Sequence, residues 1–140
     1  MTLNNTTTDK NFWVVSNKPD SPWARTVQEA LSPLGQVHFT TEEEAVTQIG
    51  QYSCDLIIIA SGDIEGEIGS LVQKIHEVKP DVPLVVTTNS PTWRRAREVF
   101  LAGATDYIRR TLDKEKILSF YQNVLQNPPP TPASTDISDP

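Results

Sequence analysis

The sequence that indicates the fold most clearly is Cys54-Asp55-Leu56-Ile57-Ile58-Ile59-Ala60-Ser61-Gly62, near the middle of a chain of 140 residues. It contains five consecutive apolar residues, three of them β-branched, with no polar residue between them. An uninterrupted run of this length is typical of a strand buried on both faces, inside a parallel sheet that helices cover. In such open sheets, ligands bind beyond the carboxyl ends of the strands. Here that end carries Ala60 and Ser61, so no reactive group follows the strand.

Four more strands are expected on the two sides of this segment, at residues 12–15, 36–39, 82–87 and 106–109. Between them, apolar residues recur at spacings of three and four, which is typical of helices with one buried face. We expect these helices over residues 21–34, 41–49, 64–78, 90–102 and 111–125. Gly35 and Gly103 stand where the first and fourth of them would end.

Capping residues mark the expected helix starts. Ser21 and Ser90 are each followed by a proline, which suits the first helical position because its missing N–H leaves no bond unmade. Thr41 begins a capping-box pattern that ends in the glutamates at 42–44, and the helix dipole would stabilise these acids. Thr111 or a neighbour is expected to cap the last helix.

The five expected strands alternate with five expected helices, joined by short loops. Such alternation requires parallel strands with right-handed crossovers, so we predict a three-layer α/β sandwich. We assign it to one domain over residues 11–126. The polar residues 1–10 are expected to be a disordered lead-in, and the proline-rich residues 127–140 a disordered tail.

Composition argues against several classes of protein. A net charge of −6 disfavours general nucleic-acid binding. No apolar run reaches the roughly 18 residues that a membrane span needs, and the amino terminus does not resemble a signal peptide, so we expect a cytoplasmic protein without membrane contact. Cys54, the one cysteine, is expected to be a core thiol. His38 and His76 lack neighbours at ligand spacing, so no metal site is expected.

Three phrases of the sequence resemble the receiver domain of two-component response regulators, over residues 12–126. Asp55-Leu56-Ile57-Ile58-Ile59 is similar to the third strand of that family, and Val82-Pro83-Leu84-Val85-Val86-Thr87-Thr88 to its fourth. Ala102-Gly103-Ala104-Thr105-Asp106-Tyr107-Ile108 is similar to the end of its fourth helix and its fifth strand. The resemblance implies a flavodoxin-like (βα)5 sandwich with strand order 2-1-3-4-5.

Receivers transfer a phosphoryl group to an aspartate that ends the third strand, with Mg²⁺ held by an acidic pair after the first strand. A Ser or Thr ending the fourth strand and a Lys ending the fifth then bind the phosphoryl group. In this chain the acidic pair falls on Ser16 and Asn17, and the acceptor falls on Ala60. The hydroxyl position is Thr88 and the lysine position is Arg110. The resemblance therefore implies a degenerate receiver, or pseudo-receiver.

Neutral residues at these positions offer no carboxylate to Mg²⁺ or to a phosphoryl group, so we expect no cofactor and no phosphorylation on aspartate. Asp63, three residues beyond Ala60, is the substitute carboxylate to consider. Ser16 or Ser61 would be acceptors for a different kind of kinase. The aromatic residue of the family's switch is kept as Tyr107.

Positive charge is concentrated late in the chain, where residues 94–116 hold seven of the twelve Lys and Arg residues. In a receiver-like fold this interval builds the helix 4–strand 5–helix 5 face, the family's usual partner and dimerisation surface. We expect a docking face for an acidic or signalling protein, or for a second copy, made by Trp93, Arg94, Arg95, Arg97 and Arg109. The plainer alternative is a solvated helix face with a half-buried Trp93. Nothing marks a DNA-binding element, so nucleic acid is not expected as a partner.

These features predict a stand-alone receiver-like signalling domain that works without aspartate phosphorylation, through protein–protein interaction in a two-component or phosphorelay-type context. No paired acid and base can be assigned at the strand ends, so an enzyme is not expected. The alternative is a small-molecule or anion sensor whose crevice uses Thr88, Arg110 and Ser61. The plainer role for Arg110 is an ion pair with Asp63 or Asp106, or a solvated side chain.

Overall fold

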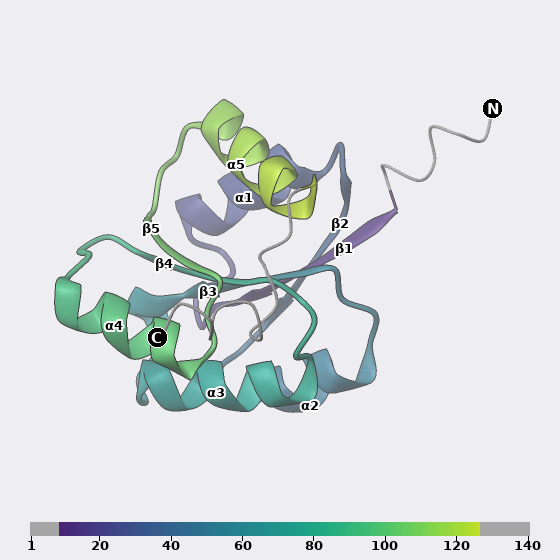
Figure 1. Cartoon of the computed structure of the whole chain (residues 1–140). Helices are drawn as coiled ribbons and strands as arrows, with labels where there is room; N and C mark the ends of the chain where they lie inside the picture. Colours follow the sequence, from purple (N-terminus) through teal and green to yellow (C-terminus); the bar gives the residue numbers. More distant parts are fainter. Residues whose placement is uncertain (1–8, 127–140) are drawn as a thin grey trace.

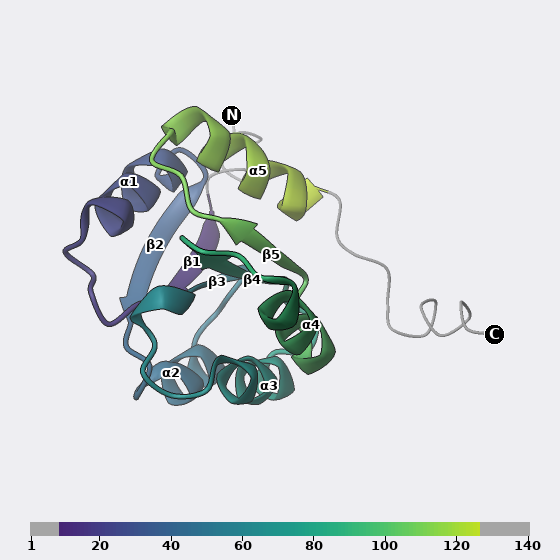
Figure 2. The same ribbon diagram turned by 90° about the vertical axis from the view of Figure 1, so that its left-hand side faces the viewer.

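The structure, a computed structural model, describes residues 9–126. Within them, five strands form one parallel sheet in the order β2-β1-β3-β4-β5, as predicted. The strands are β1 (Lys10–Val15), β2 (Gly35–Thr40), β3 (Leu56–Ala60), β4 (Leu84–Thr88) and β5 (Asp106–Arg109). The helices are α1 (Pro22–Leu31), α2 (Ala45–Gln51), α3 (Ile68–Val78), α4 (Trp93–Ala102) and α5 (Lys114–Gln126). Figures 1 and 2 show α1 and α5 on one face of the sheet and the other helices on the opposite face, which confirms the three-layer sandwich.

The middle of the sheet is buried on both faces. Every residue of β3 and β4 is buried, as the apolar run at 56–60 predicted for β3. Successive side chains of a strand point to opposite faces. Leu56 and Ile58 therefore pack with α1 and α5, whereas Ile57 and Ile59 pack with α2, α3 and α4. Burying one such side chain stabilises a fold by about 1.5–3 kcal/mol, so β3 holds both helical layers onto the sheet.

Helix α1 begins where the sequence predicted and ends earlier. The Ser21 hydroxyl oxygen accepts the N–H of Ala24 at 3.2 Å, which confirms the cap. The helix ends at Leu31, and Gly35 is instead the first residue of β2. A side chain at Gly35 would collide with the backbone of Lys10 on β1. This glycine therefore permits the close approach of two strands, and its assignment as a helix stop was wrong.

Two helices on the opposite face begin later than predicted. Helix α2 starts at Ala45, because Thr41 closes a separate turn in which its hydroxyl oxygen accepts the N–H of Glu44 at 3.3 Å. Helix α3 starts at Ile68, which leaves Ile64 in the loop that precedes it. The capping box at Thr41 is therefore a turn that precedes the helix.

Helix α4 also starts later than predicted, at Trp93. Its cap is Thr92, whose hydroxyl oxygen accepts the N–H of Arg95 at 3.1 Å. Ser90, the predicted cap, donates its own N–H to the Thr88 hydroxyl oxygen at 3.1 Å instead. Since that contact belongs to the turn after β4, the prediction for Ser90 was wrong.

The predicted end of α4 is confirmed, whereas α5 starts at Lys114, three residues later than predicted. Gly103 follows α4 with φ of 121°, a conformation that glycine adopts without strain. A neighbour of Thr111 caps α5, since the Asp113 carboxylate accepts the N–H groups of Glu115 and Lys116 at 3.0 and 3.2 Å.

Strand β1 begins at Lys10, inside the segment that we expected to be a lead-in, and pairs there with Gly35. The remainder of the predicted lead-in and tail, residues 1–8 and 127–140, lies outside the described residues. No helix of the described part is long and apolar enough to cross a membrane. Cys54 is partly buried, and burial raises the pKa of its thiol to about 12, so it remains a neutral thiol at neutral pH.

Candidate functional site

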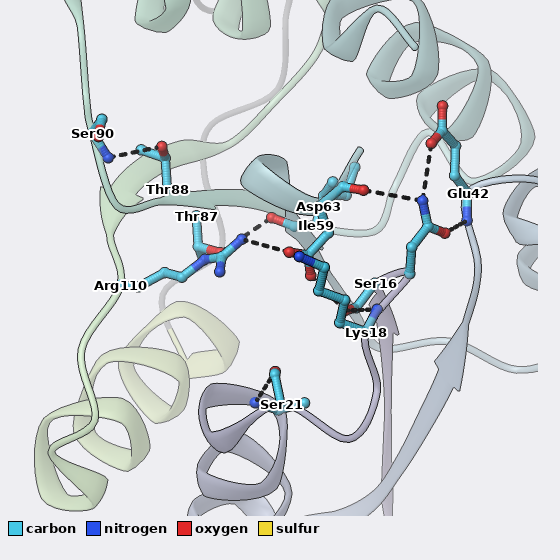
Figure 3. A network of polar contacts seen from close by, with 12 residues as sticks. Ser16, Lys18, Ser21, Glu42, Ile59, Asp63, Thr87, Thr88, Ser90 and Arg110 are labelled. Atoms are coloured by element: carbon cyan, nitrogen blue, oxygen red, sulfur yellow. Dashed lines mark hydrogen bonds and ion pairs between the residues drawn. The ribbon is translucent and has the colours of Figure 1, made fainter. Parts of the chain in front are cut away.

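The carboxyl ends of the parallel strands bring the predicted site positions to one edge of the sheet. Ser16 and Asn17 follow β1, Ala60 ends β3, Thr88 ends β4, and Arg110 follows β5. The methyl side chain of Ala60 is fully buried. The polar contacts at this edge are made by the side chains around it, which Figure 3 shows.

Asp63 brings a buried carboxylate to this edge, and its two oxygens face different partners. It belongs to a short 3-10 turn, Ser61–Asp63, directly after β3. The Ser16 hydroxyl donates to Asp63 Oδ2 at 2.7 Å. Asp63 Oδ1 lies 3.9 Å from Arg110 Nη2, and both side chains are about nine-tenths buried, with 8% and 10% of their surface exposed. The expected pair of Arg110 with Asp63 is therefore present (Figure 3).

Arg110 is held between this ion pair and an aromatic ring. Its guanidinium carbon lies 4.8 Å from the centre of the Trp23 ring in α1, a cation–π contact that stabilises a desolvated cation. Burial lowers the pKa of Arg110 below its usual value, and the charge of Asp63 offsets only part of this effect. Trp23 is itself buried in the core, and nothing in the sequence indicated its contact with Arg110.

Asn17 and Glu42 join the loops that follow three strands. The Asn17 amide nitrogen donates to the Asp63 carbonyl at 3.0 Å and to Glu42 Oε1 at 3.2 Å, and its oxygen accepts the N–H of Glu42 at 3.0 Å. The Glu42 carboxylate also accepts the N–H groups of Glu65 and Gly66, both at 2.8 Å. These bonds lower the pKa of Glu42. Its predicted role at a helix N-terminus was wrong, because partners distant in sequence hold it.

Thr88 and Tyr107 make local contacts near the start of α4. Thr88 is 7% exposed, and its hydroxyl oxygen accepts the N–H of Ser90. The Tyr107 hydroxyl oxygen accepts the N–H of Thr92 at 3.3 Å. Tyr107 thereby connects β5 to the residue that caps α4.

The donor groups at this edge do not fit Mg²⁺. That ion requires near-octahedral oxygen ligands at about 2.0–2.1 Å, usually including one or two carboxylates. The positions after β1 carry a hydroxyl and an amide, Ser16 and Asn17, and the nearby carboxylate of Asp63 already contacts Ser16 and Arg110. Across residues 9–126, no group of three or more His, Cys, Asp or Glu residues is placed to hold a metal ion.

Helix α4 is poorly covered by the rest of the fold. Val99 is its one buried residue, and three large apolar side chains are exposed, by 85%, 77% and 46% for Trp93, Leu101 and Phe100. Trp93 is thus not the half-buried residue of the plainer alternative. Helical spacing places five residues on the face away from Val99. We call this face the α4 surface, and its residues are Trp93, Arg94, Arg97, Phe100 and Leu101.

The two remaining residues of the predicted docking face have partners beside the α4 surface. Arg95 Nε lies 3.6 Å from Glu98 Oε1, and Glu98 Oε2 accepts the N–H of Gly69 in α3 at 3.2 Å. Arg109 donates from Nη1 to the carbonyl of Asn89 at 3.0 Å. Of the predicted docking residues, Trp93, Arg94 and Arg97 therefore lie on the α4 surface, whereas Arg95 and Arg109 contact other residues of the fold.

No protein-family model matches this sequence, and no curated protein matches it. Among solved structures, a two-component response regulator from Clostridium difficile is 19% identical, with a TM-score of 0.74 over 85% of this chain and 98% of that one. A response regulator from Thermotoga maritima is 21% identical, with a TM-score of 0.73 over 85% of this chain and 100% of that one. The BeF3-activated DrrB receiver domain is 21% identical, with a TM-score of 0.71 over 84% and 98% of the two chains. The chain therefore has the fold of response-regulator receiver domains.

Proposed function

We propose that this protein is a receiver-like signalling domain that works without phosphorylation on aspartate and acts by binding another protein. One observation carries the proposal: the Asp63–Arg110 pair and the Ser16 hydroxyl occupy the edge of the sheet where a receiver would take its phosphoryl group. The context we infer is a two-component or phosphorelay-type pathway, and the role is binding rather than catalysis.

The chemistry of the edge supports independence from phosphate. A receiver's acceptor must be a carboxylate, and β3 ends in the methyl group of Ala60. Asp63 is 8% exposed and contacts both Ser16 and Arg110. Turning Asp63 outward to react would leave a buried guanidinium without its counter-charge, at a cost of about 3–5 kcal/mol. Asp63 is therefore a structural partner of Arg110 in our proposal.

Contacts within the protein hold the loops of this edge in place, a role that a bound phosphoryl group would otherwise have. Asn17 and Glu42 tie together the loops after β1, β2 and β3, and Tyr107 contacts the residue that caps α4. The domain thus keeps one arrangement of its loops without an added ligand. In this view the signalling output is the permanent presentation of the α4 surface.

The α4 surface suits an acidic protein partner. It combines exposed Trp93, Phe100 and Leu101 with the charges of Arg94 and Arg97. Trp and Arg are the residue types that contribute most at interface centres. A chain with a net charge of −6 that gathers arginines on one helix would orient an acidic partner toward that helix.

The test is capture of partners from cell extract with the tagged protein, compared with a Trp93→Ala/Arg97→Glu variant. We expect the variant to lose partner affinity by at least roughly thirty-fold, corresponding to about 2 kcal/mol. Arg25→Glu, which reverses an exposed arginine on α1, is the matched control and should bind normally. Equal recovery by all three proteins would rule out the α4 surface. Recovery of the chain's own copies alone would identify a homodimer instead.

A further inference from the structure

A cleft lies beside Arg110, on the side of α1. It has a volume of about 330 Å³, which is within the range of about 300–1,000 Å³ for small-molecule sites. Its walls come from the start of α1, the loop after β4 and the loop after β5, through Ser21, Pro22, Trp23, Asn89, Arg110, Thr111 and Leu112. The crevice that the sequence predicted, with Thr88 and Ser61, shares only Arg110 with this cleft.

Arg110 lines this cleft, and its guanidinium has unmade hydrogen bonds. Its side chain is 10% exposed, and Nε and Nη2 are buried without a hydrogen-bond partner among the described residues. The separation of 3.9 Å from Asp63 is an ion pair but too long for a hydrogen bond. Buried polar groups in native proteins are nearly all satisfied, so an unsatisfied one points to a missing water, ion or ligand. A planar guanidinium matches an oxyanion, which accepts two parallel N–H bonds.

The other walls favour an anion that carries an apolar part. Ser21 to Trp23 form the first turn of α1, so the positive end of that helix dipole lies at the cleft. Among residues 9–126, none of those that line it is acidic. Pro22 and Leu112 add apolar surface at the same place, and Leu112 is 61% exposed. Thr111 and Asn89 supply polar groups beside Arg110.

We propose that this cleft binds the oxyanion of a small organic acid, either a carboxylate or a phosphate monoester. Arg110 pairs with the oxyanion, and the organic part lies against Pro22 and Leu112. The site is separate from the α4 surface, and the proposal stands whether or not that surface binds a protein.

The test is a titration of the full-length ¹⁵N-labelled protein, followed by amide and side-chain NMR signals. Benzoate and phenyl phosphate are the two probes, since they share one ring and differ in the oxyanion. Benzyl alcohol is the uncharged control. We expect saturable shifts at Trp23, Asn89, Thr111 and Leu112 and at Nε–H of Arg110 with at least one anion and none with the alcohol. The probe with the higher affinity identifies the ligand as a carboxylate or a phosphate monoester.

Two matched variants keep the test decisive, since replacing Arg110 would leave Asp63 buried and unpaired. Leu112→Glu places a like charge at the rim of the cleft and should weaken anion binding roughly ten-fold or more. Leu101→Glu makes the same change at an exposed leucine of α4 and should leave binding unchanged. Absence of saturable shifts with both anions would overturn the proposal. Equal weakening by the two variants, or shifts centred on Asn17 and Ala60, would overturn it as well.

Discussion

Arg110 is the residue on which the interpretation of the strand edge depends. It follows β5 directly, and it is buried between Asp63 and the ring of Trp23. A buried ion pair is weak evidence for net stability, but removing one partner is costly because the other charge stays behind. Asp63 should therefore matter more to this fold than an ordinary surface acid.

We predict that Asp63→Asn lowers the free energy of unfolding by about 3–5 kcal/mol, because it leaves the Arg110 charge buried without a counter-charge. Urea denaturation measures this change directly. Glu29→Gln is the matched control, since it removes a carboxylate from the exposed Glu29–Lys114 pair, which solvent screens, and it should lower the free energy of unfolding far less. A similar small loss for both variants would mean that the Asp63–Arg110 contact is not a true buried pair.

At the scale of single elements, the apolar runs specified the strands well. The run at 56–60 became β3 with every residue buried. A strand that is covered on both faces must be apolar at every position, so its own residues are enough to predict it. Helix starts were harder to predict. The pairs Ser90–Pro91 and Thr41–Glu44 satisfy capping rules locally, yet both lie in turns before their helices. A hydroxyl that caps a helix and one that closes a turn make the same kind of bond.

The start of α4 offers a direct comparison of two such hydroxyls. Thr92 caps the helix through its side chain, whereas Ser90 contributes its backbone N–H to the preceding turn. We predict that Thr92→Ala lowers the free energy of unfolding by about 1 kcal/mol and that Ser90→Ala changes it by less than about 0.5 kcal/mol. Thermal or urea unfolding of the two variants distinguishes them. The reverse ranking would contradict the assignment of Thr92 as the cap.

At the scale of the whole molecule, the sequence predicted the sheet order and placed Ser16, Ala60, Thr88 and Arg110 at one edge, where the structure has them. It offered the Asp63–Arg110 pair as the plainer role of Arg110, but it did not predict the contacts of Asp63 with Ser16 or of Glu42 with Glu65. The contacts of Asp63 and Glu42 join residues more than twenty positions apart, and no local pattern encodes such pairings. The sequence also left Trp93 open between a docking face and a half-buried side chain, since an aromatic residue at a helix start looks the same in sequence whether it is buried or exposed.

The sheet edge and the α4 surface are linked through the fold itself. Strand β5 carries Tyr107, which contacts the cap of α4, and it leads directly to Arg110 at the edge. If phosphate bound at Asp63, it would have to break the Asp63–Arg110 pair before any rearrangement of the edge could pass through β5 to α4. We therefore propose that the protein gives no such response to phosphate.

The most direct test compares amide NMR spectra of the protein in Mg²⁺ before and after addition of beryllofluoride, which mimics an aspartyl phosphate. We expect no shifts at Ala60, Thr88 or Tyr107, because the nearby carboxylate of Asp63 already contacts Ser16 and Arg110. Saturable shifts at these residues that spread through 93–110 would contradict the claim. They would show that Asp63 accepts the phosphate mimic and that the switch is still active.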